Sequence, residues 1–194
     1  MDSKNKGRLL SKLSLLLVIF AFFMPISCEQ NGFQLISHMS DIKDSYLPLV
    51  AVLMMVLFVV SLITICYSIY LFATNKKGAS PLDIPSISIC VLSAMLSYCI
   101  AQNYMKTIAL QIGAYFIITG LFVSIVFLII SEILSAKSME KFQPSLLLLP
   151  VIMIVIGAIP FCFIESALIL KTIGLVFGVI GIVAGALMIS VNKR

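Results

Sequence analysis

Residues able to do acid–base, nucleophilic or metal chemistry are scarce in this chain. Its 194 residues include one His, no Trp and eight acidic residues, and the five cysteines show no C-x-x-C spacing. A zinc site needs several Cys or His ligands, and acid–base catalysis needs ionisable groups held near one another. No H-E-x-x-H, G-x-S-x-G or Walker sequence is present. We therefore predict a protein with no enzymatic activity, no metal site and no cofactor.

One polar segment, residues 28–46, combines residue types that bind metals. His38, Asp41 and Asp44 follow one another at i, i+3 and i+6. Apolar residues in the same segment have helical spacing: Leu35, Met39, Ile42 and Tyr46. The pattern predicts an amphipathic helix, begun at Asn31-Gly32, that lies on the outer membrane surface or covers the end of a helix bundle. A single His with scattered carboxylates is an incomplete ligand set, so we interpret the polar face as solvated.

Small residues form two stripes with helical spacing. The first contains Gly174, Gly178, Gly181 and Gly185, and the second contains Ala109, Gly113, Gly120 and Ser124. Glycine and other small residues let helix backbones approach closely in lipid, where dispersion contacts drive packing. We expect these two faces to contact each other. An interface between copies of the chain and a ligand channel are the alternatives.

Hydroxyl groups form a third pattern. Ser86, Ser93 and Ser97, with Cys90 among them, share one face of an apolar stretch, and Ser61, Thr64 and Ser68 share a face of the preceding stretch. Such groups bond across helices or line a polar cavity, but they also bond the carbonyl four residues earlier in their own helix. Structural packing is the favoured interpretation, and a polar seam between the helices is the alternative.

The apolar composition of the chain predicts that these residues lie on membrane-spanning helices. Hydrophobic residues make up 61% and charged residues 11% of the chain, with a mean hydropathy of +1.18. Soluble domains average about 45–50% apolar and about 25% charged residues. This excludes a soluble enzyme, a nucleic-acid-binding module and a disordered chain. With about 20 residues needed per crossing, six stretches qualify as membrane spans: 9–26, 47–73, 84–101, 107–131, 146–164 and 167–191.

The basic residues indicate orientation. If the N-terminus is cytoplasmic and the chain crosses six times, most of the 13 basic residues fall inside: Lys4, Lys6, Arg8, Lys12, Lys76, Lys77, Lys137, Lys141, Lys193 and Arg194. Lys43, Lys106 and Lys171 fall outside. This bias predicts that both termini are cytoplasmic. No ionisable residue is expected in the middle of a span. Lys12 lies in the first span, but close enough to its start for the ammonium group to reach the membrane surface.

The first stretch has a second interpretation. A basic start, an apolar run and a small residue before Cys28 are also typical of a secretory signal, with Cys28 as the lipidated residue. Pro25 occupies position −3, where such signals usually carry an aliphatic residue. We favour an uncleaved membrane anchor.

Residues 13–36 resemble a loose group of small bacterial multi-pass membrane proteins. The shared element is Pro-x-Ser-Cys followed by Gly-aromatic-x-Leu, represented here by Pro25, Ser27, Cys28, Gly32, Phe33 and Leu35. The resemblance implies a bacterial membrane protein and no particular activity.

These observations predict an all-α integral membrane bundle of about six helices, residues 1–194, in a bacterial cytoplasmic membrane. Its partners are the lipid bilayer and other membrane subunits or further copies of itself, and nucleic acid is not among them. We predict a structural or accessory subunit of a membrane assembly. A transporter or small-molecule-binding subunit, with a polar seam between spans two, three and five, is the alternative.

Overall fold

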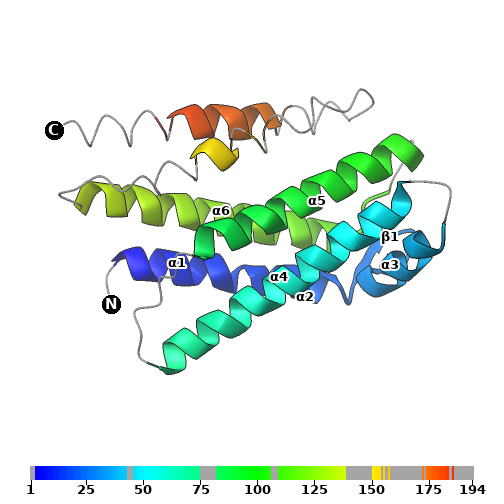
Figure 1. Ribbon diagram of the computed structural model, residues 1–194, viewed down its shortest axis with the longest axis horizontal. Coiled ribbons are helices and arrows are strands. Elements are labelled where there is room, and N and C mark those ends of the chain that lie inside the picture. Colours follow the sequence, from blue (N-terminus) through cyan, green and yellow to red (C-terminus); the bar gives the residue numbers. More distant parts are fainter. Residues whose placement is uncertain are drawn as a thin grey trace.

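The computed structural model of the chain is mostly helical, and its long helices run along a common direction (Figure 1). It describes residues 3–42, 46–74, 82–105, 109–138, 150–153, 155, 157, 172, 174–183 and 185. Three of the described helices are long and apolar enough to cross a membrane. The all-α prediction therefore holds, with one short β-hairpin as an addition.

The first helix is a nearly continuous rod made of α1 (Ser3–Leu13) and α2 (Leu15–Ala21). Ser14, between them, keeps helical backbone angles, and its N–H still donates to the Leu10 carbonyl at 3.0 Å. The rod ends at Ala21, short of the predicted end at Ile26. Pro25 begins a strand instead, since a proline cannot donate to the helical hydrogen-bond pattern.

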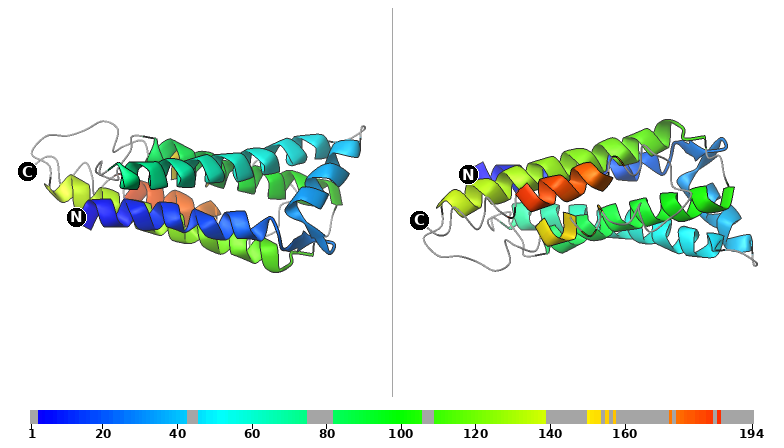
Figure 2. Two further views of the ribbon diagram at one scale, coloured as in Figure 1. Left: turned by 90° about the horizontal axis from the view of Figure 1, so that it is seen from below. Right: turned by 90° about the horizontal axis from the view of Figure 1, so that it is seen from above.

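Three long apolar helices follow: α4 (Leu47–Ala73), α5 (Asp83–Met105) and α6 (Ile112–Ser138). Their directions alternate along the bundle, and α6 lies beside the first helix (Figure 2). The helix α6 begins later than the predicted span at residue 107. The reason is that Leu110 pairs with Ser27, and the Gln111 N–H donates to the Ile26 carbonyl at 3.0 Å.

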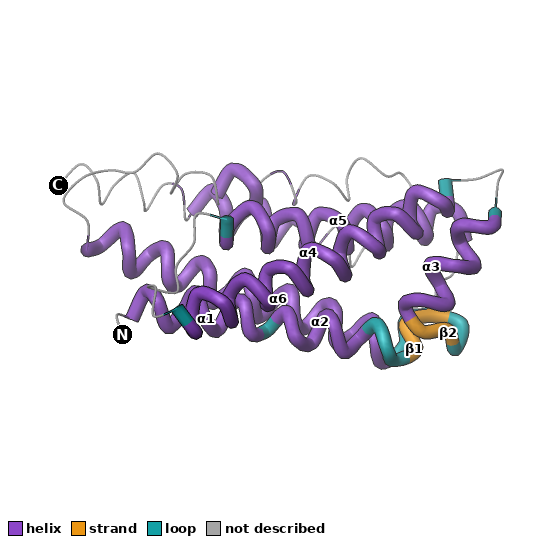
Figure 3. Tube along the Cα trace, turned by 60° about the horizontal axis from the view of Figure 1, so that its bottom comes forward, coloured by secondary structure: helices purple, strands orange, loops and turns teal. Residues whose placement is uncertain are grey.

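A hairpin and a short helix cover one end of the bundle (Figure 3). The strands β1 (Pro25–Ser27) and β2 (Gln30–Asn31) are antiparallel and joined by Cys28 and Glu29, whose φ angles are 50° and 61°. Two-residue hairpin turns of type I′ require a positive φ angle at both central residues. The predicted amphipathic helix is present as α3 (Gly32–Asp41), and it starts at a capping box in which Asn31 and Gln34 bond each other's backbone N–H.

The core explains why α3 covers the bundle. Leu35 and Met39 are buried, and Phe22, Phe33 and Phe58 form a cluster of rings whose centroids lie 5.0–5.9 Å apart. A side chain at Gly32 would overlap the Phe22 ring. The apolar face of α3 is thus packed against protein, which decides between the two predicted positions of this helix.

Beyond α6, the described residues 150–153, 155, 157 and 174–183 are helical. Met153 is buried and Phe177 is half-buried against the core formed by the other helices. Most of the predicted fifth and sixth spans, 146–164 and 167–191, lies outside the described residues.

Candidate functional site

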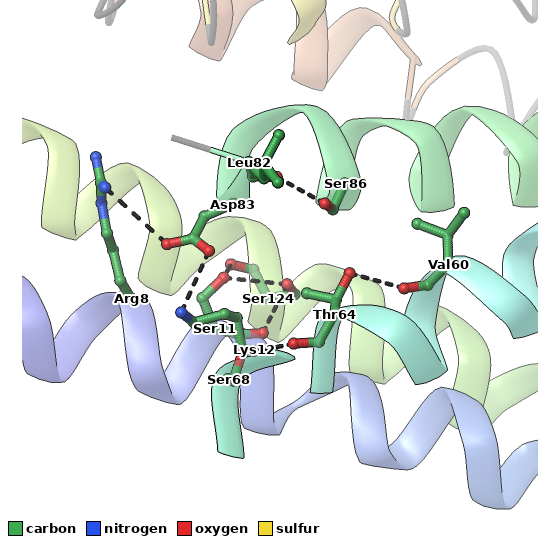
Figure 4. Close-up of polar contacts among 10 residues, drawn as sticks. All are labelled: Arg8, Ser11, Lys12, Val60, Thr64, Ser68, Leu82, Asp83, Ser86 and Ser124. Atoms are coloured by element: carbon green, nitrogen blue, oxygen red, sulfur yellow. Dashed lines mark hydrogen bonds and ion pairs between the residues drawn. The ribbon is translucent and has the colours of Figure 1, made fainter. Parts of the chain in front are cut away.

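Three charged side chains meet inside the bundle, between the first helix and the start of α5 (Figure 4). The Lys12 Nζ lies 3.2 Å from Asp83 Oδ1, and the Arg8 Nη1 lies 4.0 Å from Asp83 Oδ2. The exposed fractions of the Lys12 and Asp83 side chains are 2% and 3%, and that of Arg8 is 12%. We call Arg8, Lys12 and Asp83 the buried charge cluster.

Helix geometry brings these residues together. Arg8 and Lys12 are four residues apart on α1, so they share a face. Asp83 is the first residue of α5, where the positive end of the helix dipole favours a carboxylate. The prediction that Lys12 reaches the membrane surface is wrong, because Asp83 supplies an opposite charge that lets the ammonium group stay buried.

A pair of serines adjoins the cluster and ties the first helix to α6. The Ser11 Oγ donates to the Ser124 carbonyl at 2.7 Å, and the Ser124 Oγ donates to the Ser11 carbonyl at 2.8 Å. Both side chains are fully buried. Each hydroxyl thus reaches the backbone of the other helix, which requires the two helices to approach closely.

The close approach is made possible by glycines on both helices. A Cβ added at Gly113 would lie 2.9 Å from the Ala21 and Pro25 carbonyl oxygens, and one at Gly120 would lie 3.0 Å from the Ser14 carbonyl oxygen. A Cβ at Gly7 would lie 2.9 Å from the Ser131 Cβ. We call this contact the first-helix interface.

The expected contact between the two small-residue stripes is therefore corrected. Gly113, Gly120 and Ser124 pack against the first helix and not against the stripe at 174–185. Ala109, the first residue of that predicted stripe, precedes α6 and is exposed. The matching pattern on the partner helix is Gly7, Ser11, Ser14 and Ala21. Sequence reasoning missed it because these residues lie in the basic and apolar segments that also resemble a secretory signal.

The stripe at 174–185 has its own neighbours. A Cβ at Gly157 would lie 2.5 Å from the Gly174 carbonyl oxygen and 2.8 Å from the Gly178 nitrogen. Gly181 is buried, and a Cβ at Gly185 would lie 3.3 Å from the Pro150 Cβ. A Cβ at Gly178 would meet no atom of the described residues within 4 Å.

Three of the hydroxyl groups predicted to form a polar seam make their hydrogen bonds within their own helices. Ser86, Thr64 and Ser68 donate to the carbonyls four residues earlier, those of Leu82, Val60 and Thr64, at 2.6–2.7 Å. The faces of α4 and α5 do meet at Ser61 and Cys90, whose Oγ and Sγ are 3.4 Å apart. Ser93 and Ser97 are buried on α5, and Ser97 Oγ is the one buried side-chain oxygen in the described part of the chain that has no hydrogen-bond partner.

Two spaces adjoin these helices. A void of about 10 Å³ lies among α5, α6 and the described residues that follow, lined by Ile87, Ser88, Val91, Ile125, Leu128, Ile152, Met153 and Phe177. That volume is near the least that holds one water molecule. A larger groove of about 230 Å³ separates α1 from the end of α4, lined by Leu9, Lys12, Leu13, Ile65, Ser68, Ile69 and Phe72. We call the latter the α1–α4 groove.

The polar face of α3 carries His38 and Asp41, two of the three residues considered as metal ligands. His38 and Asp41 are exposed, and the His38 Nδ1 lies 3.3 Å from the Gln30 Nε2. Asp44 lies outside the described residues. No cluster of His, Cys, Asp or Glu suited to a metal occurs among the residues that the structure describes. Cys28, the lipidated residue in the alternative interpretation of the first stretch, is exposed in the hairpin turn.

No protein-family model, no curated protein and no solved structure matches this chain.

Proposed function

We propose that this chain is a non-enzymatic, multi-pass membrane protein that serves as a structural or accessory subunit of a membrane assembly. The observation that carries the proposal is the way small residues are used. The first-helix interface brings two helix backbones into contact, and a Cβ at Gly178, on the helix at 174–183, would meet none of the described residues within 4 Å. In lipid, small-residue positions on a helix are where a further helix packs.

The test of this proposal compares assemblies in the native membrane. Extraction with an amphipathic polymer, which keeps the surrounding lipid, is expected to yield particles that contain more than one polypeptide. The variant Gly178→Leu is expected to yield particles that contain a single chain. Val179→Leu, at an exposed position on the same helix, is the control and should leave the assembly intact. A wild-type particle that contains one copy of this chain and no other protein would contradict the proposal.

The full topology belongs to the same proposal: six spans, both termini in the cytoplasm, in the cytoplasmic membrane of a bacterium. It is supported by the alternating directions of the first helix, α4, α5 and α6. The helix α4 ends at the end of the bundle where α1 begins (Figure 1), and Lys76 and Lys77 follow α4 in the sequence. In the sequence, basic residues thus flank the helix ends on this side, as the positive-inside rule predicts.

Accessible cysteines provide a test of this topology. In a background without the five native cysteines, Lys106→Cys is expected to react with a membrane-impermeant maleimide in intact cells. Lys137→Cys is expected to react only after the membrane is permeabilised. Reaction of both variants from the same side would contradict the six-span arrangement.

We also propose that the first helix is kept as an anchor and that Cys28 carries no lipid. The support is packing: Leu15, Val18, Ala21 and Phe22 are fully buried against the rest of the bundle. Removal of this helix would expose the glycines of α6 that it covers. The resemblance of residues 13–36 to small bacterial membrane proteins is consistent with a retained first helix.

A transporter or small-molecule-binding subunit is the second candidate. The observation that favours it is the buried charge cluster, because ionisable groups inside a membrane often mark transport pathways. The Ser61–Cys90 contact between α4 and α5 places polar atoms within the same bundle. The void of about 10 Å³ beside α5 is too small for a substrate larger than water, so this candidate ranks below the first.

A further inference from the structure

We draw no further inference here: the strongest candidate, the α1–α4 groove lined by Lys12 and by apolar side chains of α1 and α4, carries none, because nothing in the part of the chain that the structure describes shows what covers it.

Discussion

Asp83→Asn is expected to lower the free energy of unfolding by about 3–5 kcal/mol, because it removes the carboxylate that faces the buried Lys12 ammonium group. Lys12→Met is expected to act in the same direction by a smaller amount, since Arg8 still lies 4.0 Å from Asp83. The Lys12 and Asp83 side chains are almost completely buried and lie 3.2 Å apart. Reversible unfolding of the purified protein in detergent micelles, followed by circular dichroism, measures the effect.

The double variant Lys12→Met/Asp83→Leu distinguishes two contributions to the free energy of unfolding: the penalty for a buried charge that has lost its opposite charge, and the net stabilisation by the ion pair. Replacing both charges with apolar side chains of similar size is expected to restore stability to near the wild-type value. Glu29→Gln, an exposed substitution in the hairpin turn, is the control and should change stability by less than about 0.5 kcal/mol. Single variants within that margin, or a double variant that loses the sum of both effects, would contradict a buried ion pair.

Gly113→Ala is expected to destabilise the bundle by about 1–3 kcal/mol. The added methyl group would lie 2.9 Å from two carbonyl oxygens, that of Ala21 at the end of the first helix and that of Pro25 in β1. Neither is a flexible side-chain end, so the helices themselves must move apart. Gly120→Ala is expected to act in the same direction, since its Cβ would lie 3.0 Å from the Ser14 carbonyl oxygen.

Gly178→Ala is the matched control for these substitutions. Its Cβ would meet no described atom within 4 Å, so the effect expected is the higher helix propensity of Ala, worth up to about 1 kcal/mol in favour of folding. The same unfolding measurement applies to all three variants. Equal effects at Gly113 and Gly178 would show that the first helix does not pack against α6 at this distance.

Local features of this chain could be predicted from the sequence. The start of α3 is an example, because the Asn31 side chain bonds a backbone group within the next turn and needs no distant residue. Apolar runs likewise predicted helices α4, α5 and α6, since a helix satisfies its own backbone hydrogen bonds in lipid. The small residues at Gly113, Gly120 and Ser124 were identified as a packing face from their spacing alone.

Partner choice could not be predicted in the same way. The stripe on α6 was expected to contact the one at 174–185, but its partner is the first helix. In a soluble helix, a polar face would show which side is buried. Here α4, α5 and α6 are apolar on their exposed and on their buried sides, so their sequences do not show which side contacts another helix.

The buried charge cluster shows the same limit most directly. The sequence by itself determined that this chain is apolar, helical and biased in its basic residues, because these properties depend on composition and on neighbours along the helix. Only the tertiary structure decided that Lys12 is buried, because its burial depends on Asp83, which a different helix brings to within 3.2 Å. A charge stays out of water only where an opposite charge compensates for the lost solvation, and that compensation is created by the packing of the helices.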